Sequence, residues 1–142
     1  MRRMIFAVFL FCFIQTYAKS PDIPEALWNA KTAYVQNSGS STEKDYNKLY
    51  EALKNWGRFE LVQDKSSADI YIILYSAVEA KRMMRPGIGS SASAIEDIQV
   101  IINSIRILNT KDGAQLWTDK SSAENNDPKI LVSKLKNMMK KK

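Results

Sequence analysis

Four acidic residues beside predicted strand ends are the side chains of this 142-residue chain best suited to chemistry. Asp64 and Asp69 flank a short turn, and Glu96 and Asp97 are adjacent in the sequence. A hydrolase that uses two carboxylates needs them across a cleft, roughly 5–10 Å apart. The alternative hypothesis is therefore a carboxylate-dependent hydrolase that acts on an envelope or extracellular substrate. Acids beside turns more often accept hydrogen bonds from the local backbone.

The composition removes most other catalytic designs. The chain has no histidine, which is the commonest general base and metal ligand, so a Ser-His-Asp triad is impossible. The one cysteine, Cys12, lies in an N-terminal apolar segment that we expect to be removed. The remaining chain has no thiol nucleophile and no thiolate for a metal site. The sequence assigns no catalytic residue, no cofactor and no metal, and it favours a protein that is not an enzyme.

A basic stretch between two apolar runs offers a candidate contact surface. Residues 77–94 contain the turn pair Pro86-Gly87 and several small residues, so we interpret this stretch as a flexible basic loop. Methionine side chains adapt to different partners, and here they stand beside cations. The candidate partner-contact residues are Lys81, Arg82, Met83, Met84 and Arg85.

The N-terminus has the pattern of a secretory signal. Arg2 and Arg3 precede an apolar run over residues 4–14, and Thr16 and Ala18 are the small residues that a signal peptidase requires. The run is shorter than the roughly 20 residues of a membrane-spanning helix. We expect residues 1–18 to be a cleaved signal peptide, the protein to be periplasmic or secreted, and no transmembrane span to remain after processing.

Periodicity divides the rest of the chain into strands and helices. Pro21 and Pro24 indicate an extended leader over residues 19–30, which precedes a single domain over residues 31–142. Apolar residues from Tyr46 to Trp56 recur at spacings of three and four, which predicts a helix that Thr42 caps and Gly57 ends. A second helix is predicted to begin at Asp127-Pro128. Strands are predicted over residues 31–37, 58–64, 69–76, 98–108 and 114–119.

These elements follow the order β-α-β-β-β-β-α. Residues 98–108 and 114–119 flank Lys111-Asp112-Gly113, which predicts a hairpin that carries Ile105, Ile107, Leu116 and Trp117. The expected fold class is α+β, a two-layer α/β sandwich with one mixed five-stranded sheet and two helices packed on one face.

Three strings carry a resemblance to known proteins: AKTAYVQN, YEALKNWGRFELVQDKSSADIYIIL and ILNTKDGAQLWTD. Over the mature length they resemble an uncharacterised family of small secreted bacterial α/β proteins, and the pattern is similar to the amino-terminal domain of TolB. The resemblance implies the fold and the envelope compartment. It transfers no catalytic residue.

The leading hypothesis is an exported, non-enzymatic binding or envelope-associated module of unknown ligand. Its partner would be another envelope protein or an anionic surface polymer. Nucleic-acid binding is not expected, because a dense basic stripe with interleaved aromatic residues is missing. A third hypothesis is a structural subunit whose sheet edge pairs with a copy of itself.

Overall fold

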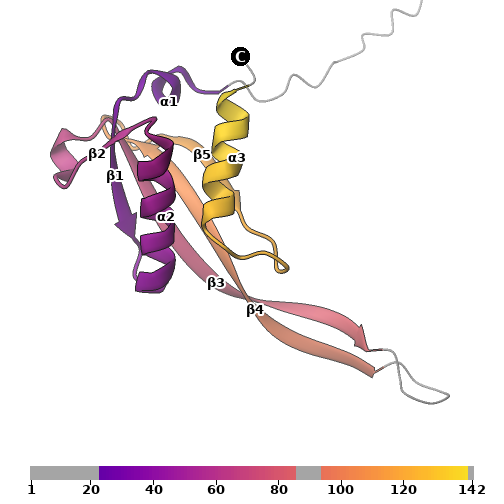
Figure 1. The fold of residues 1–142 in the computed structure, drawn as a ribbon. Coiled ribbons are helices and arrows are strands. Elements are labelled where there is room, and N and C mark those ends of the chain that lie inside the picture. Colours follow the sequence, from indigo (N-terminus) through magenta and orange to yellow (C-terminus); the bar gives the residue numbers. More distant parts are fainter. Residues whose placement is uncertain (1–22, 86–93, 141–142) are drawn as a thin grey trace, which may run out of the picture.

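A long β-hairpin runs through the centre of the molecule and extends past the helices and the other strands (Figure 1). The computed structural model describes residues 23–85 and 94–140, so the predicted signal peptide, the start of the leader and residues 86–93 lie outside it. The elements in chain order are α1 (Glu25–Asn29), β1 (Thr32–Asn37), α2 (Glu43–Trp56), β2 (Glu60–Leu61), a 3-10 turn (Lys65–Ser67), β3 (Ile70–Arg85), β4 (Ala94–Asn109), β5 (Gln115–Lys120) and α3 (Lys129–Met139).

The strands form one mixed five-stranded sheet in the order β2-β1-β3-β4-β5. β1 is parallel to both β2 and β3, whereas β4 is antiparallel to β3 and β5. Figure 1 shows α2 and α3 side by side over the same face of this sheet. The predicted α+β sandwich is therefore confirmed.

The core lies between the sheet and the two long helices. Alternate residues of β3, among them Ile70, Ile72 and Leu74, are buried on the helix side. Leu49 and Leu53 meet them from α2, and Leu131, Val132, Leu135 and Met139 meet them from α3.

Both ends of α2 follow the sequence prediction. The Thr42 hydroxyl accepts a hydrogen bond from the Asp45 backbone N–H over 3.1 Å. Gly57 has φ +67°, and its N–H donates to the Leu53 carbonyl. A left-handed residue at this position closes the helix at little cost only when it lacks a Cβ atom.

The hairpin between β4 and β5 also matches its prediction. Ile107 pairs with Trp117, and Gly113 takes φ +71° in the turn. Ile105 and Ile107 are fully buried, while Leu116 and Trp117 pack against the core from β5.

Two predictions about irregular segments were wrong. The extended leader was predicted through residue 30, but Glu25–Asn29 forms α1, and Leu27 is fully buried. Pro24 favours this start because its missing N–H is not needed in the first turn of a helix. The flexible loop was predicted over residues 77–94, but residues 77–85 continue β3 and Ala94 begins β4.

Replacing Leu53 by alanine tests the packing of α2 on the sheet. Leu53 is 1% exposed, so the variant should lose about 2–5 kcal/mol of unfolding free energy, through lost burial and the cavity left behind. Urea unfolding measures this loss. The exposed neighbour Lys54 is the control, and Lys54→Ala should change stability by less than about 0.5 kcal/mol. Equal losses at both positions would contradict the packing of this helix face.

Candidate functional site: the β-arm

Beyond the body of the sheet, β3 and β4 continue as a two-stranded ribbon. β1 pairs with β3 only as far as Leu74, and β5 pairs with β4 only from Ser104. The pairing of β3 with β4 continues outward to Arg85 and Ala94 (Figure 1). We call residues 77–85 of β3 and 94–102 of β4 the arm.

An apolar pair is exposed on the inner half of the arm. Val78 lies directly opposite Ile101, and their side chains are 64% and 48% exposed. Among residues 23–82 and 97–140, these two are the strongly exposed large apolar side chains. Apolar groups that share a solvent-facing spot mark a contact site more often than isolated ones do.

Charged side chains flank this apolar pair. Arg82 and Asp97 are register partners farther out, and their Nε and Oδ1 atoms are 3.4 Å apart. Both side chains remain mostly exposed. Exposed pairs of this kind contribute little to stability, so both groups are available to another molecule.

Other ion pairs connect the arm to the end of β5 and to the loop that follows it. The Lys81 ammonium contacts the Glu124 carboxylate, and hydrogen bonding from Lys81 lowers the pKa of that carboxyl group. Lys120 approaches Glu79 within 3.3 Å. Of the predicted contact residues, Lys81 is therefore engaged within the chain, Arg82 is exposed, and Met83, Met84 and Arg85 lie in β3.

The base of the arm is held by one fully buried polar residue, Asn103. The Ser76 hydroxyl donates to its Oδ1 atom, and its Nδ2 atom donates to the Asn126 carbonyl over 2.6 Å. Its backbone exchanges hydrogen bonds with Ser121: the Asn103 N–H donates to the Ser121 hydroxyl, and the Ser121 N–H donates to the Asn103 carbonyl. This network joins β3, β4 and the loop that leads to α3. Sequence reasoning missed it, because Asn103 was one polar residue inside a β-branched run.

The acidic residues of the hydrolase hypothesis are not brought together. Asp69 immediately precedes β3, whereas Asp97 pairs with Arg82, thirteen residues farther along the chain and thus roughly 40 Å away. Asp64 caps the 3-10 turn by accepting from the Ser66 N–H and hydroxyl. Glu96 lies in β4 on the arm.

Asp69 instead joins the starts of two strands. Its Oδ2 atom accepts hydrogen bonds from the backbone N–H groups of Lys31 and Thr32, over 2.8 and 3.0 Å. The hydrogen bond from Lys31, followed by that from Thr32, lowers the pKa of this carboxyl group. The pKa of Asp64 is lowered by its hydrogen bonds from Ser66. A lowered pKa suits a structural acceptor and opposes the role of general acid at neutral pH.

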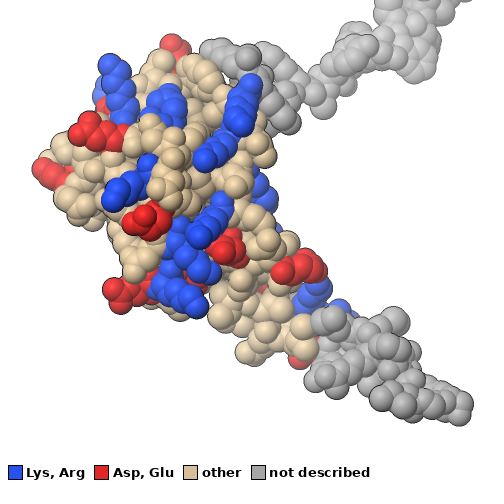
Figure 2. Space-filling model, viewed as in Figure 1, with Lys and Arg blue, Asp and Glu red and all other residues tan. Residues whose placement is uncertain are grey.

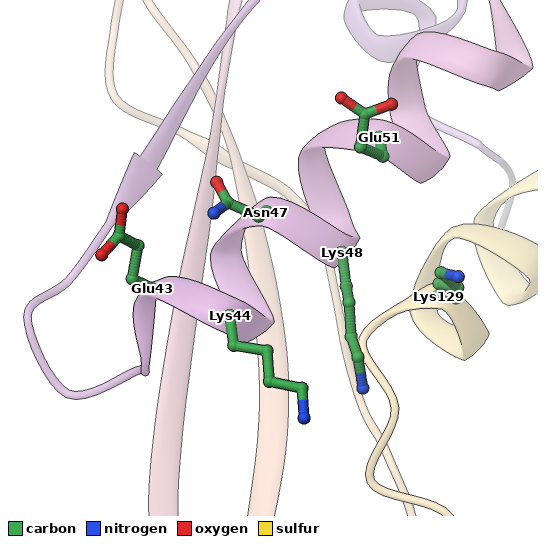
Figure 3. Close-up of a pocket in the computed structure, with 6 residues that line it drawn as sticks. All are labelled: Glu43, Lys44, Asn47, Lys48, Glu51 and Lys129. Carbon is green, nitrogen blue, oxygen red and sulfur yellow. The ribbon is translucent and has the colours of Figure 1, made fainter.

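The helix side carries an open groove with a volume of about 540 Å³ along α2 and the start of α3 (Figure 3). Its lining residues are Glu43, Lys44, Asn47, Lys48, Glu51 and Lys129. Figure 3 shows that these side chains project outward and do not converge on one point. Figure 2 shows cationic and acidic groups intermixed over this face. The groove therefore lacks the convergent polar groups of a catalytic site.

Within the described part of the chain, no group of three or more acidic, cysteine or histidine side chains is placed to hold a metal ion. No helix in residues 23–85 or 94–140 has the length and apolar character needed to cross a bilayer.

No family model matches the chain, and no curated protein matches it either. Among solved structures, it is similar to a PelC dodecamer from Paraburkholderia phytofirmans, with a TM-score of 0.40 and 11% sequence identity. The match covers 79% of this chain and 90% of that one. The resemblance to the TolB amino-terminal domain stays a prediction.

Removing the Asn103 side chain should loosen the junction between arm and body. Asn103→Ala removes the buried amide that bonds the Ser76 hydroxyl and the Asn126 carbonyl, which should cost about 1–3 kcal/mol of unfolding free energy. Amide hydrogen exchange should also accelerate in residues 77–82 and 97–102. The exposed Asn47→Ala is the control. Unchanged exchange in the arm would contradict the proposed role of this network.

Asp69 should make stability depend on pH. A carboxyl group whose pKa is lower in the folded chain contributes stability above its unfolded pKa, and this contribution is lost as the pH falls through the folded value. Asp69→Asn should therefore lower stability at pH 7, by about 1 kcal/mol, and should flatten the decline below pH 4. Urea unfolding at pH 7 and pH 3 measures both effects. Asp97→Asn on the arm is the control, and a decline as steep in Asp69→Asn as in the unmodified protein would refute the assignment.

Proposed function

We propose that this protein is a non-enzymatic binding module that acts after export and holds a partner protein through its β-arm. The observation that carries the proposal is the extension of β3 and β4 past β1 and β5, with Val78 and Ile101 exposed on the extension. An isolated two-stranded ribbon is marginally stable in water. A ribbon that carries exposed apolar groups gains stability when another chain covers them.

The arm suits a protein partner better than a polysaccharide or lipid surface. Both outer edges of the ribbon present backbone N–H and C=O groups, which pair with an extended peptide by strand addition. Exposed apolar side chains beside such an edge supply the side-chain specificity. An anionic polymer would use the exposed cation Arg82, but Asp97 lies against it. An envelope protein that offers a free strand edge is therefore the favoured partner class.

A catalytic role has less support. The acids of the hydrolase hypothesis are dispersed, and Asp64 and Asp69 accept hydrogen bonds that stabilise the local backbone. The groove beside α2 offers no nucleophile with an adjacent base. The proposal that the protein is exported rests on the N-terminal sequence pattern. A binding role in the envelope is consistent with that pattern.

Photocrosslinking in the source organism tests the proposal. A photoreactive phenylalanine analogue replaces Val78 or Gln99 on the arm, and Glu51 or Glu60 on the body serves as the exposed control. Discrete protein adducts should form from the two arm positions and not from the controls. Mass spectrometry of the adducts identifies the partner and reads the N-terminus, which should be Lys19. Identical adducts from all four positions, or none from the arm, would overturn the proposal.

A further inference from the structure

We propose that a second copy of this chain occupies the arm: the free β3 edge of one arm pairs antiparallel with the free β4 edge of the next. This inference rests on the proposed function and names its partner. It follows from the backbone groups, the apolar pair and the charged pair that the two edges carry.

The direction of the edge groups follows from hydrogen bonds at the base of the arm. The Ser76 N–H points away from β4, because it donates to the Ser40 hydroxyl, and the Leu74 carbonyl accepts from the Ser38 N–H on the same side. Backbone groups alternate along a strand, so Val78 and Arg82 also present their N–H and C=O to this outer edge.

The opposite edge follows by the same reasoning. Asn103 exchanges backbone hydrogen bonds with Ser121 on the β5 side. Ile101, Gln99 and Asp97 therefore present their backbone groups to the outer edge of β4. Within residues 23–85 and 94–140, no third strand pairs with either edge of the arm. Each arm thus offers one free β3 edge and one free β4 edge, and each edge carries both N–H donors and C=O acceptors.

The side chains beside these edges are complementary to each other. Val78, Ala80 and Arg82 lie on one face of the ribbon, as do Ile101, Gln99 and Asp97. When two arms point the same way without stagger, the β3 edge meets the neighbour's β4 edge in the register that already joins β3 to β4 within one chain. Val78 then faces Ile101 of the second copy, and Arg82 faces Asp97 of the second copy.

Symmetric pairings lack this complementarity. If two β3 edges paired antiparallel about Ala80, Arg82 would face the apolar Val78. If two β4 edges paired about Gln99, Asp97 would face Ile101. Both arrangements place a charge against an apolar group. The charges therefore favour a head-to-tail contact, and such a contact leaves a free edge at each end for further copies.

Mixing two charge-reversed variants tests this contact. Alone, Arg82→Asp sets two carboxylates against each other across the contact, and Asp97→Arg sets two guanidinium groups against each other. In an equimolar mixture, each variant supplies the charge that the other needs, whereas the pair within each chain stays repulsive. The mixture therefore separates attraction between copies from attraction within one copy. Sedimentation velocity of the leaderless chain, over a range of concentrations at low salt, measures association.

The unmodified protein should associate with increasing concentration. Each variant alone should show a dissociation constant raised about tenfold, and the mixture should recover most of that loss. Lys44→Asp and Glu51→Arg are controls on α2, away from the arm. They change the net charge by the same amounts as the arm variants and should associate like the unmodified protein. Circular dichroism verifies that every variant is folded.

The outcomes separate this inference from the proposed function. A chain that stays monomeric at all concentrations, variants that associate like the unmodified protein, or a mixture that associates no better than the single variants would each overturn self-pairing. Arm-specific crosslinks to a different protein would then still support the binding role. Crosslinks between the arms of two copies of this chain, together with restored association in the mixture of variants, support both the binding role and self-pairing.

Discussion

The antiparallel pairing of β3 with β4 is the constraint on which the rest of the structure depends. It continues over sixteen register pairs, from Ile70 and Asn109 to Arg85 and Ala94. At its inner end, β1 and β5 extend the ladder into a sheet, and the helices cover one face. At its outer end, the same ladder continues without further strands. One interaction therefore supplies both the centre of the core and the exposed arm.

The five-stranded body ends and the two-stranded arm begins at Asn103 and Ser76. On the body side of this pair, the positions facing the helices are apolar and buried, as at Leu74 and Ile105. On the arm side, the same face carries the exposed Val78 and Ile101. A buried amide that both accepts and donates a hydrogen bond is directional in a way that an apolar contact is not. Asn103 thus fixes where the body ends and how the arm leaves it.

Most of the body could be predicted from the sequence, because local signals agreed with the tertiary fold. The helix from Thr42 to Gly57 had a cap, an apolar stripe and a left-handed stop, and it forms as expected. The β3 half of the arm could not be predicted. The sequence Glu79-Ala80-Lys81-Arg82 lacks the alternation of a half-buried strand, because none of these four residues is buried in a core. Register with β4 is what makes this segment a strand, and that pairing is not visible in the local pattern.

The candidate acids were misjudged for a related reason. Proximity to a turn suggested a shared site for Asp64 and Asp69, but each carboxylate is occupied by backbone N–H groups beside it. A turn leaves some backbone N–H groups without a backbone acceptor, and a nearby carboxylate is the most readily available acceptor for them. The basic residues were predicted to lie in a loop, but residues 77–85 continue β3.

The body and the arm treat their sheet edges differently, and this contrast argues that the arm is built to bind. On one side the body ends in β2, which has only two residues. On the other, Lys134 from α3 approaches Asp119 and donates to the Lys120 carbonyl, so a cation covers part of the β5 edge. Short strands and lysines are the devices that prevent edge-to-edge association. At the inner half of the arm Val78 and Ile101 are exposed, although Lys120 also reaches Glu79 there. In the proposed function, a chain that protects the edges of its body leaves the arm as the surface that another strand completes.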